Sequence, residues 1–221
     1  MSTERAGSSE PAGIRRAAVV VARHSAAAGS PPGIDPRAFA TACLADSYEV
    51  LADLVSVASG IASNDPEARE LLWPGALRLD GELTPAEIVE QLAGDFDEVV
   101  LVPADVPDLP GLVLAKVFKA LQRADVCVAP ERGSGGGCVA LGLRAPWPSW
   151  VTTALDLDED PRDILQGAAP RRSQVSVGPD WHRMRTPAAI QRLDPGLEGW
   201  EMTRSLLAGH VLSAAPSPEP S

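Results

Sequence analysis

Residues 99–110 read VVLVPADVPDLP, and this stretch decides the fold. Its first half is a short, continuous run of aliphatic residues, which is typical of a strand buried on both faces. Its second half places Asp105 and Asp108 directly after that strand. Because open α/β sheets bind ligands in the crevice outside the carboxyl ends of their strands, we expect both carboxylates to lie at a ligand site.

The rest of the chain alternates strand and helix patterns in the same way. Short apolar runs predict strands at residues 17–22, 54–58, 98–102, 125–129, 138–143 and 174–177. Helical patterns predict helices at residues 36–54, 84–94 and 112–122, and a last one that opens at Thr186-Pro187. This order predicts an α/β three-layer sandwich with a mostly parallel sheet, in one domain spanning residues 14–210. The polar ends, 1–13 and 211–221, are predicted to be disordered.

Composition excludes several classes of partner. The net charge of −11 argues against nucleic acid or an anionic membrane surface as the main partner. No run of about 18 apolar residues occurs, so no membrane span is predicted. The N-terminus lacks the basic and apolar regions of a secretory signal. The three cysteines show no metal-ligand spacing, which favours free thiols in a reducing compartment. We therefore expect a cytoplasmic protein.

The two carboxylates after the 98–102 strand allow two interpretations. Carboxylate oxygens are ligands for Mg²⁺ or Mn²⁺, which often share them with substrate phosphates. Alternatively, Asp105 or Asp108 caps the helix that begins near Pro110, since turns from strand to helix commonly carry Asp for that purpose. Position in the sequence does not separate these interpretations.

The same stretch carries a resemblance to a known family. VVLVPADVPDLP, the strand DVCVAP at 125–130 and GGGCVALGL at 135–143 resemble a bacterial glycosyltransferase-like family of the glycosyltransferase-A fold, whose relatives are called selenodomain-associated transferases. More distantly, the stretch is similar to the 2-phospholactate and molybdenum-cofactor guanylyltransferases. The resemblance implies a fold like that of the nucleotide-diphospho-sugar transferases. It also implies a nucleotide or nucleotide-sugar ligand, transfer of a glycosyl or nucleotidyl group, and a Mg or Mn cofactor.

The resemblance assigns roles to two carboxylates and two glycines. Asp105 matches the carboxylate expected near the metal and the diphosphate, and so becomes the candidate catalytic and metal-binding residue. Asp108 matches the Pro-Asp-Leu-Pro turn, and is a candidate substrate-binding residue. Gly136 and Gly137 match a glycine pair whose backbone N–H groups can approach a diphosphate, although a plain loop between strands fits as well. Arg132 beside them is either an anion clamp or a solvated residue.

The sequence also departs from the family pattern, and these departures bear on the function as much as the matches do. The family's basic loop after the first strand is replaced by RHSAAAGSPP at 23–32, which has lost most of its cations. Its acidic residue before the glycine pair is Gly135 here. Its Asp-x-Asp before Thr-Pro is replaced by Arg183 and Arg185. In an extended segment these two side chains point to one face, where they would repel a metal and bind a phosphate or carboxylate. Alternatively, both are solvated.

Two classes of function follow from these residues. Asp105 favours a divergent glycosyltransferase or nucleotidyltransferase that handles a nucleotide-activated substrate. The lost basic loop and the arginines at 183 and 185 favour a non-catalytic relative that binds a nucleotide, a metabolite or a protein partner. Since fold alone does not determine function, the arrangement of the site must separate the two.

Overall fold

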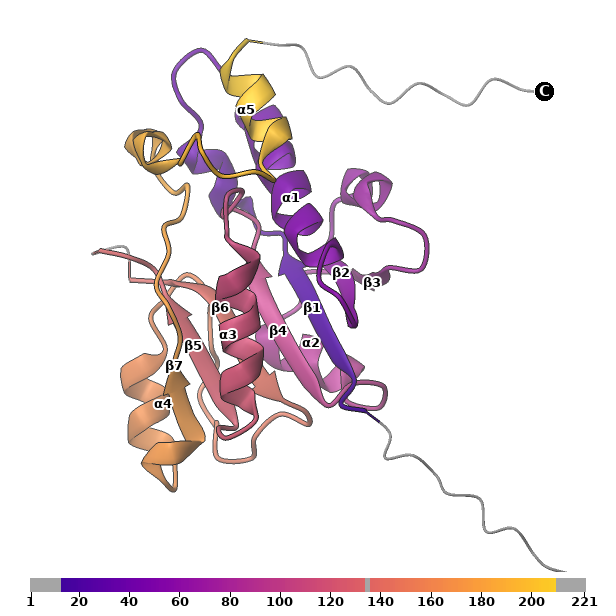
Figure 1. The fold of residues 1–221 in the computed structure, drawn as a ribbon, viewed down its shortest axis with the longest axis vertical. Helices are drawn as coiled ribbons and strands as arrows, with labels where there is room; N and C mark the ends of the chain where they lie inside the picture. The colour runs from indigo at the N-terminus through magenta and orange to yellow at the C-terminus, as the bar shows by residue number, and fades with distance from the viewer. Residues whose placement is uncertain (1–12, 134–135, 210–221) are drawn as a thin grey trace, which may run out of the picture.

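A seven-stranded sheet forms the centre of the computed structural model, which describes residues 13–133 and 136–209 (Figure 1). The strand order is β3-β2-β1-β4-β6-β5-β7, and within the described residues only β6 runs antiparallel to its neighbours. The strands are β1 (Arg16–Val21), β2 (Val57–Ser63), β3 (Leu77–Asp80), β4 (Glu98–Pro103), β5 (Val126–Pro130), β6 (Cys138–Arg144) and β7 (Val175–Val177). The predicted disorder at 1–13 and 211–221 lies outside the described residues, apart from Gly13.

Helices cover both faces of the sheet. The α-helices are α1 (Pro36–Ala52), α2 (Pro85–Leu92), α3 (Gly111–Leu121), α4 (Arg162–Ala168) and α5 (Glu201–Leu207). The 3-10 helices are η1 (His24–Gly29), η2 (Pro66–Leu71), η3 (Arg172–Gln174) and η4 (Pro187–Arg192). Helices α1 and α3 pack on one face, whereas α2 and Leu165 of α4 pack on the other (Figure 1). The predicted three-layer α/β sandwich is confirmed.

The β1 strand shows why its apolar run is continuous. Ala18 and Val20 belong to the core on the α1 and α3 face, while Val19 and Val21 belong to the core on the α2 face. Each is at most 5% exposed. Burying a valine side chain fully stabilises the fold by roughly 1.5–3 kcal/mol, so an apolar residue is needed at every position of a strand with two covered faces.

Helix starts follow their sequence signals closely. The Asp35 carboxylate accepts a hydrogen bond from the backbone N–H of Ala38 at 2.8 Å, which caps α1. At α2, Thr84 and Glu87 form a full capping box, with Pro85 in the first turn. These caps determine the residue at which each of the two helices begins.

Three sequence predictions differ from the structure. The strand expected at 54–58 begins at Val57 and runs on to Ser63, because a turn with Ser56 at φ 61° precedes it and Gly60 interrupts its apolar pattern. The helix expected after Thr186 is the short 3-10 helix η4. The short strand β3 and helices α4 and α5 were not predicted. Short elements carry too few residues to show a clear periodicity.

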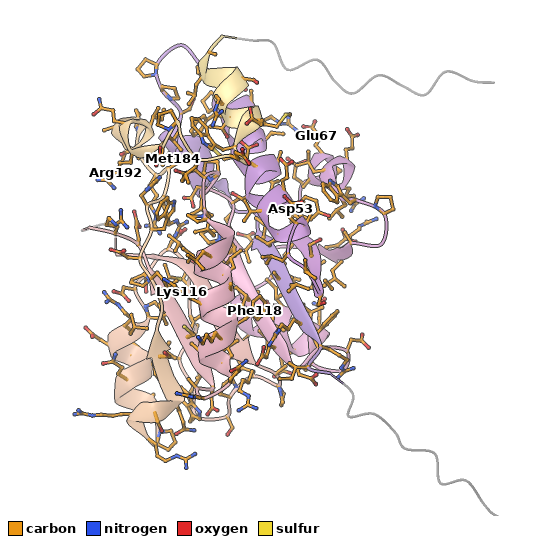
Figure 2. All side chains as sticks on the ribbon, in the orientation of Figure 1. Asp53, Glu67, Lys116, Phe118, Met184 and Arg192 are labelled. Atoms are coloured by element: carbon orange, nitrogen blue, oxygen red, sulfur yellow. The ribbon has the colours of Figure 1, made fainter. Side chains whose placement is uncertain are left out.

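The final third of the chain returns to the sheet and to α1. Met184, labelled in Figure 2, packs against Phe39 and Cys43 of α1. Its backbone N–H donates to the carbonyl oxygen of Asp105 at 2.8 Å. Segment 181–185 therefore lies directly against the loop after β4.

Strands β1 and β4 lie in one mostly parallel sheet, as the sequence predicted, and they pair directly, with Val20 opposite Val102. Their carboxyl ends, those of β2 and β5, and the start of β6 therefore meet at one edge of the sheet. Asp105 follows the last residue of β4 by two positions, so it lies at this carboxyl edge. Among the described helices, none combines the length and apolar character needed to cross a bilayer.

Candidate functional site at the carboxyl edge

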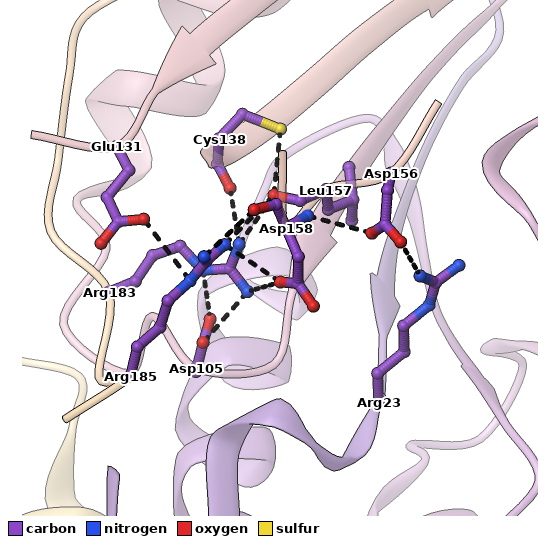
Figure 3. A network of polar contacts seen from close by, with 9 residues as sticks. All are labelled: Arg23, Asp105, Glu131, Cys138, Asp156, Leu157, Asp158, Arg183 and Arg185. Carbon is purple, nitrogen blue, oxygen red and sulfur yellow. Dashed lines mark hydrogen bonds and ion pairs between the residues drawn. The ribbon is translucent and has the colours of Figure 1, made fainter. Parts of the chain in front are cut away.

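Asp105 is fully buried and is bound by an arginine. Arg183 donates from Nε to Asp105 Oδ1 at 2.7 Å and from Nη2 to Oδ2 at 3.0 Å, so the guanidinium faces the carboxylate with two parallel hydrogen bonds (Figure 3). Both side chains are at most 1% exposed. Such bidentate pairs are among the strongest polar contacts in proteins.

The remaining N–H groups of Arg183 are also engaged. Nη2 donates to Asp158 Oδ1 at 2.7 Å, and Nη1 donates to the carbonyl oxygens of Leu157 at 2.7 Å and Cys138 at 3.4 Å. A guanidinium has five N–H donors, and these contacts use all five. Arg183 therefore has no donor left for a ligand.

Charge compensation keeps Arg183 ionised. Burial opposes its charge, but attraction and hydrogen bonds from Asp105 and Asp158 outweigh the burial, and the pKa of the guanidinium is raised above its ordinary value. Burial in the same region raises the pKa of the Cys138 thiol to about 12, so this cysteine is an unreactive neutral thiol at neutral pH.

Arg185 joins the same group of charges. It donates from Nη2 to Asp158 Oδ1 at 3.0 Å, and its Nε lies 3.4 Å from Glu131 Oε2 (Figure 3). Arg183 and Arg185 thus point to one side, as the sequence predicted, and both contact Asp158. The alternative that both are solvated is wrong, since their side chains are 1% and 22% exposed.

The donors around Asp105 do not fit a bound Mg²⁺ or Mn²⁺. Both Asp105 oxygens face the Arg183 guanidinium, whose positive charge repels a cation. Over residues 13–133 and 136–209, no group of three or more His, Cys, Asp or Glu side chains is placed to hold a metal ion. The alternative role as a helix cap also fails, because the N-cap of α3 is Pro110 and no side chain caps that helix.

Asp108 holds segment 181–194 rather than a ligand. Its carboxylate accepts hydrogen bonds from Trp181 Nε1 at 3.2 Å and from the backbone N–H of Asp194 at 3.4 Å. His182 Nε2 lies 3.0 Å from Asp108 Oδ2, and the imidazole stacks on the Trp181 ring at a centroid distance of 4.9 Å. Asp108 is 2% exposed, so it is a positioning residue inside the protein.

Gly137 and Arg132 lie against other charged side chains of the protein. Gly136 has φ 76°, a conformation that favours glycine. A Cβ on Gly137 would overlap Arg185 Nη2 and lie 2.9 Å from Arg183 Nη1, so Gly137 makes room for the two guanidinium groups. Arg132 is half exposed and pairs with Asp180, with Nη2 3.1 Å from Oδ1.

An open cleft lies at the same edge, beside the buried charges. Its volume is about 620 Å³, and it is bounded by the ends of β1, β2 and β4 and by the first turns of α1. The side chains that line it are mostly small or apolar, including Ala22, Ala27, Pro36, Ala40, Leu44 and Pro66. The polar ones are Arg23, Arg37, Thr41, Ser63, Asn64 and Asp65.

Arg23 connects the cleft to the buried charges. Its Nη1 donates to Asp156 Oδ2 at 2.7 Å, and Asp156 Oδ1 accepts from the backbone N–H of Asp158 at 3.0 Å (Figure 3). Arg23 Nε is buried without a hydrogen-bond partner in the described part of the chain. Sequence reasoning did not select Arg23, although its position directly after the first apolar strand was a usable signal.

Comparison with solved structures identifies the fold family of this architecture. A protein from Desulfovibrio desulfuricans G20, provisionally described as a nucleotide-diphospho-sugar transferase, superposes with a TM-score of 0.63 over 89% of this chain and 96% of its own, at 17% identity. The chain has the nucleotide-diphospho-sugar transferase fold. The 4-diphosphocytidyl-2C-methyl-D-erythritol synthase of Anaerococcus prevotii DSM 20548 shares this fold, with a TM-score of 0.53 at 12% identity, over 81% of this chain and 99% of its own.

The sequence comparisons identify less about this chain than the structural comparisons do. A family model described as "Uncharacterized protein conserved in bacteria (DUF2064)" matches residues 79–156, which include β4, Asp105 and the start of the 156–158 segment. No curated protein matches the sequence. The resemblance to particular glycosyltransferase-like and guanylyltransferase families stays a prediction.

Proposed function

We propose that this protein binds a nucleotide or a nucleotide sugar in the cleft at the carboxyl edge, as a divergent member of the glycosyl and nucleotidyl transferases. The cleft is the main observation that supports this proposal. It lies where open α/β sheets bind ligands, and its volume of about 620 Å³ is in the range of small-molecule sites. Of two structures with the same fold, one is provisionally described as a nucleotide-diphospho-sugar transferase and the other as a 4-diphosphocytidyl-2C-methyl-D-erythritol synthase, which favours a nucleotide over other ligands.

The lining of the cleft suits a nucleoside. Ala40, Leu44 and Pro66 offer apolar surface to a base or a sugar ring. Thr41, Ser63 and Asn64 supply hydroxyl and amide groups that both donate and accept hydrogen bonds. A largely apolar site with a few polar groups is the usual composition of a small-molecule pocket.

Arg23 is the cation that we assign to the phosphate groups. Asp156 holds the guanidinium at Nη1, and the Arg23 side chain lines the cleft and is 25% exposed, so its other end can face a ligand. The start of α1 also borders the cleft, and the N-terminal end of a helix favours negative charge. Arg37, the other arginine of the cleft, is 65% exposed and has Nη2 2.8 Å from Glu67 Oε1, so its charge is partly compensated.

A second candidate function is nucleotide binding without transfer. The observation that favours it is the Asp105–Arg183 pair, since the carboxylate at the end of β4 is not available to act on a substrate. The two candidates predict the same ligand in the same cleft. They differ in whether the ligand is converted to a product.

The test is calorimetric titration with a panel of nucleoside triphosphates and nucleotide sugars, followed by an assay for released pyrophosphate or nucleoside diphosphate. We expect one nucleotide class to bind, and Arg23→Gln to weaken it about 10- to 150-fold, the loss of one charge-assisted hydrogen bond. Arg15→Gln is the matched control, because Arg15 forms an ion pair with Asp97 at the opposite edge of the sheet. No binding by any nucleotide, or equal effects of both variants, would contradict the proposal. Binding without product formation would select the second candidate.

A further inference from the structure

Five oxygen atoms converge on the guanidinium of Arg183. They come from the loop after β4, from segment 156–158 and from the first residue of β6, three parts of the chain that are far apart in sequence. The atoms are Oδ1 and Oδ2 of Asp105, Oδ1 of Asp158, and the backbone carbonyl oxygens of Leu157 and Cys138.

This oxygen set is the kind that binds a hard divalent cation. Such ions take six to eight oxygen ligands from carboxylates, backbone carbonyls and water. The two carboxylates bring two negative charges to a site where Asp105 is 0% exposed and Arg183 is 1% exposed. A positive charge must lie against Asp105, because a carboxylate without a counter-charge is very costly to bury, whereas Asp158 is 35% exposed. In this protein the Arg183 guanidinium supplies that charge.

We propose that Arg183 is a built-in cation that stands in the place of a divalent ion, and that removing its guanidinium converts the surrounding oxygens into a metal site. The site consists of Asp105, Asp158 and the two carbonyl oxygens, with water completing the coordination, while Arg185 keeps its own contact with Asp158 Oδ1 at 3.0 Å. In the native protein the guanidinium joins the three segments without any ion, so neither folding nor ligand binding depends on a metal.

The neighbouring arginine provides the matched control. Arg185 also contacts Asp158, and it is 22% exposed, so its removal leaves Arg183 between the carboxylates. Arg183→Ala and Arg185→Ala both delete one positive charge from the same cluster. A general rise in attraction for cations, which a chain of net charge −11 could show anywhere on its surface, would appear equally in both.

The experiment compares the wild type, Arg183→Ala, Arg185→Ala and the double variant Arg183→Ala with Asp105→Asn, each stripped with EDTA. Thermal unfolding and calorimetric titration are measured with MnCl₂ alone. We expect Arg183→Ala to bind Mn²⁺ at least about tenfold more tightly than Arg185→Ala or the wild type, and to gain thermal stability as Mn²⁺ is added. The double variant should lose both effects, because it lacks the Asp105 carboxylate.

The Arg183→Ala variant could fail to fold without an ion. In that case we expect refolding in MnCl₂ to restore its near-ultraviolet circular dichroism, while Arg183→Lys folds in EDTA because it keeps a cation. The proposal is overturned if folded Arg183→Ala shows no more Mn²⁺ binding than Arg185→Ala. It is equally overturned if an unfolded Arg183→Ala is not rescued by Mn²⁺. Since the probe is the metal alone, neither outcome depends on whether the protein binds a nucleotide.

Discussion

Two neighbouring regions at the carboxyl edge of the sheet differ in how their polar groups are used. Around Asp105, every N–H of Arg183 has an acceptor inside the protein, and the side chains of Asp105 and Arg183 are 0% and 1% exposed. In the cleft, about 620 Å³ of open space adjoins Arg23, whose side chain is 25% exposed. The buried charges therefore serve the structure, and the cleft is free to serve a ligand.

The difference indicates that the acidic motif around Asp105 and the proposed ligand site are two separate regions of the protein. Asp105 lies where the sequence predicted a ligand-binding carboxylate, but it pairs with Arg183 and so joins distant segments of the chain. The cleft that we propose as the ligand site lies beside it, in a region that the acidic residues Asp105 and Asp108 do not line. Mutations in the two regions should therefore affect different properties.

The largest expected effect is on stability, from breaking the buried pair. Asp105→Ala removes the main partner of Arg183 and leaves a buried charge undercompensated, which costs about 3–5 kcal/mol of the free energy of unfolding. The exposed pair between Asp180 and Arg132 is the control, and Asp180→Ala should cost about 1 kcal/mol or less. Urea denaturation at neutral pH measures both. Equal losses would show that burial does not distinguish the Asp105 pair.

A smaller loss is expected where the backbone makes room for the arginines. Gly137→Ala places a Cβ against the guanidinium groups of Arg183 and Arg185, and relieving that overlap costs roughly 1–3 kcal/mol. Gly167→Ala is the control, since its Cβ would lie in open space within α4 and should stabilise the helix slightly. Thermal unfolding compares the two. A Gly137→Ala protein as stable as the wild type would mean that the cluster is looser than described.

Within the described residues, Asp46 is a buried carboxylate that has no arginine partner, so it can be compared with Asp105. Asp46 on α1 accepts hydrogen bonds from the backbone N–H groups of Met202 and Thr203, at 3.0 and 2.7 Å. Burial raises the pKa of Asp46 to about 6. A raised pKa means that the folded protein holds the proton more tightly than the unfolded chain does. Stability from this group is therefore present below about pH 4 and is lost as the pH rises through about 6.

The Asp46→Asn variant isolates this effect, because asparagine does not ionise. We expect the stability of the wild type relative to Asp46→Asn to fall by about 1–3 kcal/mol between about pH 4 and pH 7. Urea unfolding of both proteins at the two pH values measures the difference. A difference that does not change with pH would show that Asp46 has the same pKa in the folded and unfolded states.

The fold was largely predictable because its signals are local. The apolar runs at β1 and β4, and the capping box at Thr84, each depend on residues that are close in sequence. The transitions at Ser56 and at η4 were not predictable, because neither has a strong periodic pattern.

The candidate site was predictable in position but not in role. The sequence placed Asp105 at the carboxyl edge and put Arg183 and Arg185 on one face. It could not show that Arg183 pairs with Asp105, since the pairing joins residues 78 positions apart. It also could not show the cleft, whose walls come from separate strands and from α1.

The most direct test of the account is the affinity for a nucleotide measured twice, in EDTA and in MgCl₂. The probe is the nucleotide that binds most tightly in the panel, and titration calorimetry gives both dissociation constants. Because the Arg183 guanidinium takes the place of a divalent ion at Asp105, the account predicts the same dissociation constant under both conditions. Binding that requires Mg²⁺, and that disappears in a folded Asp105→Asn protein, would contradict it.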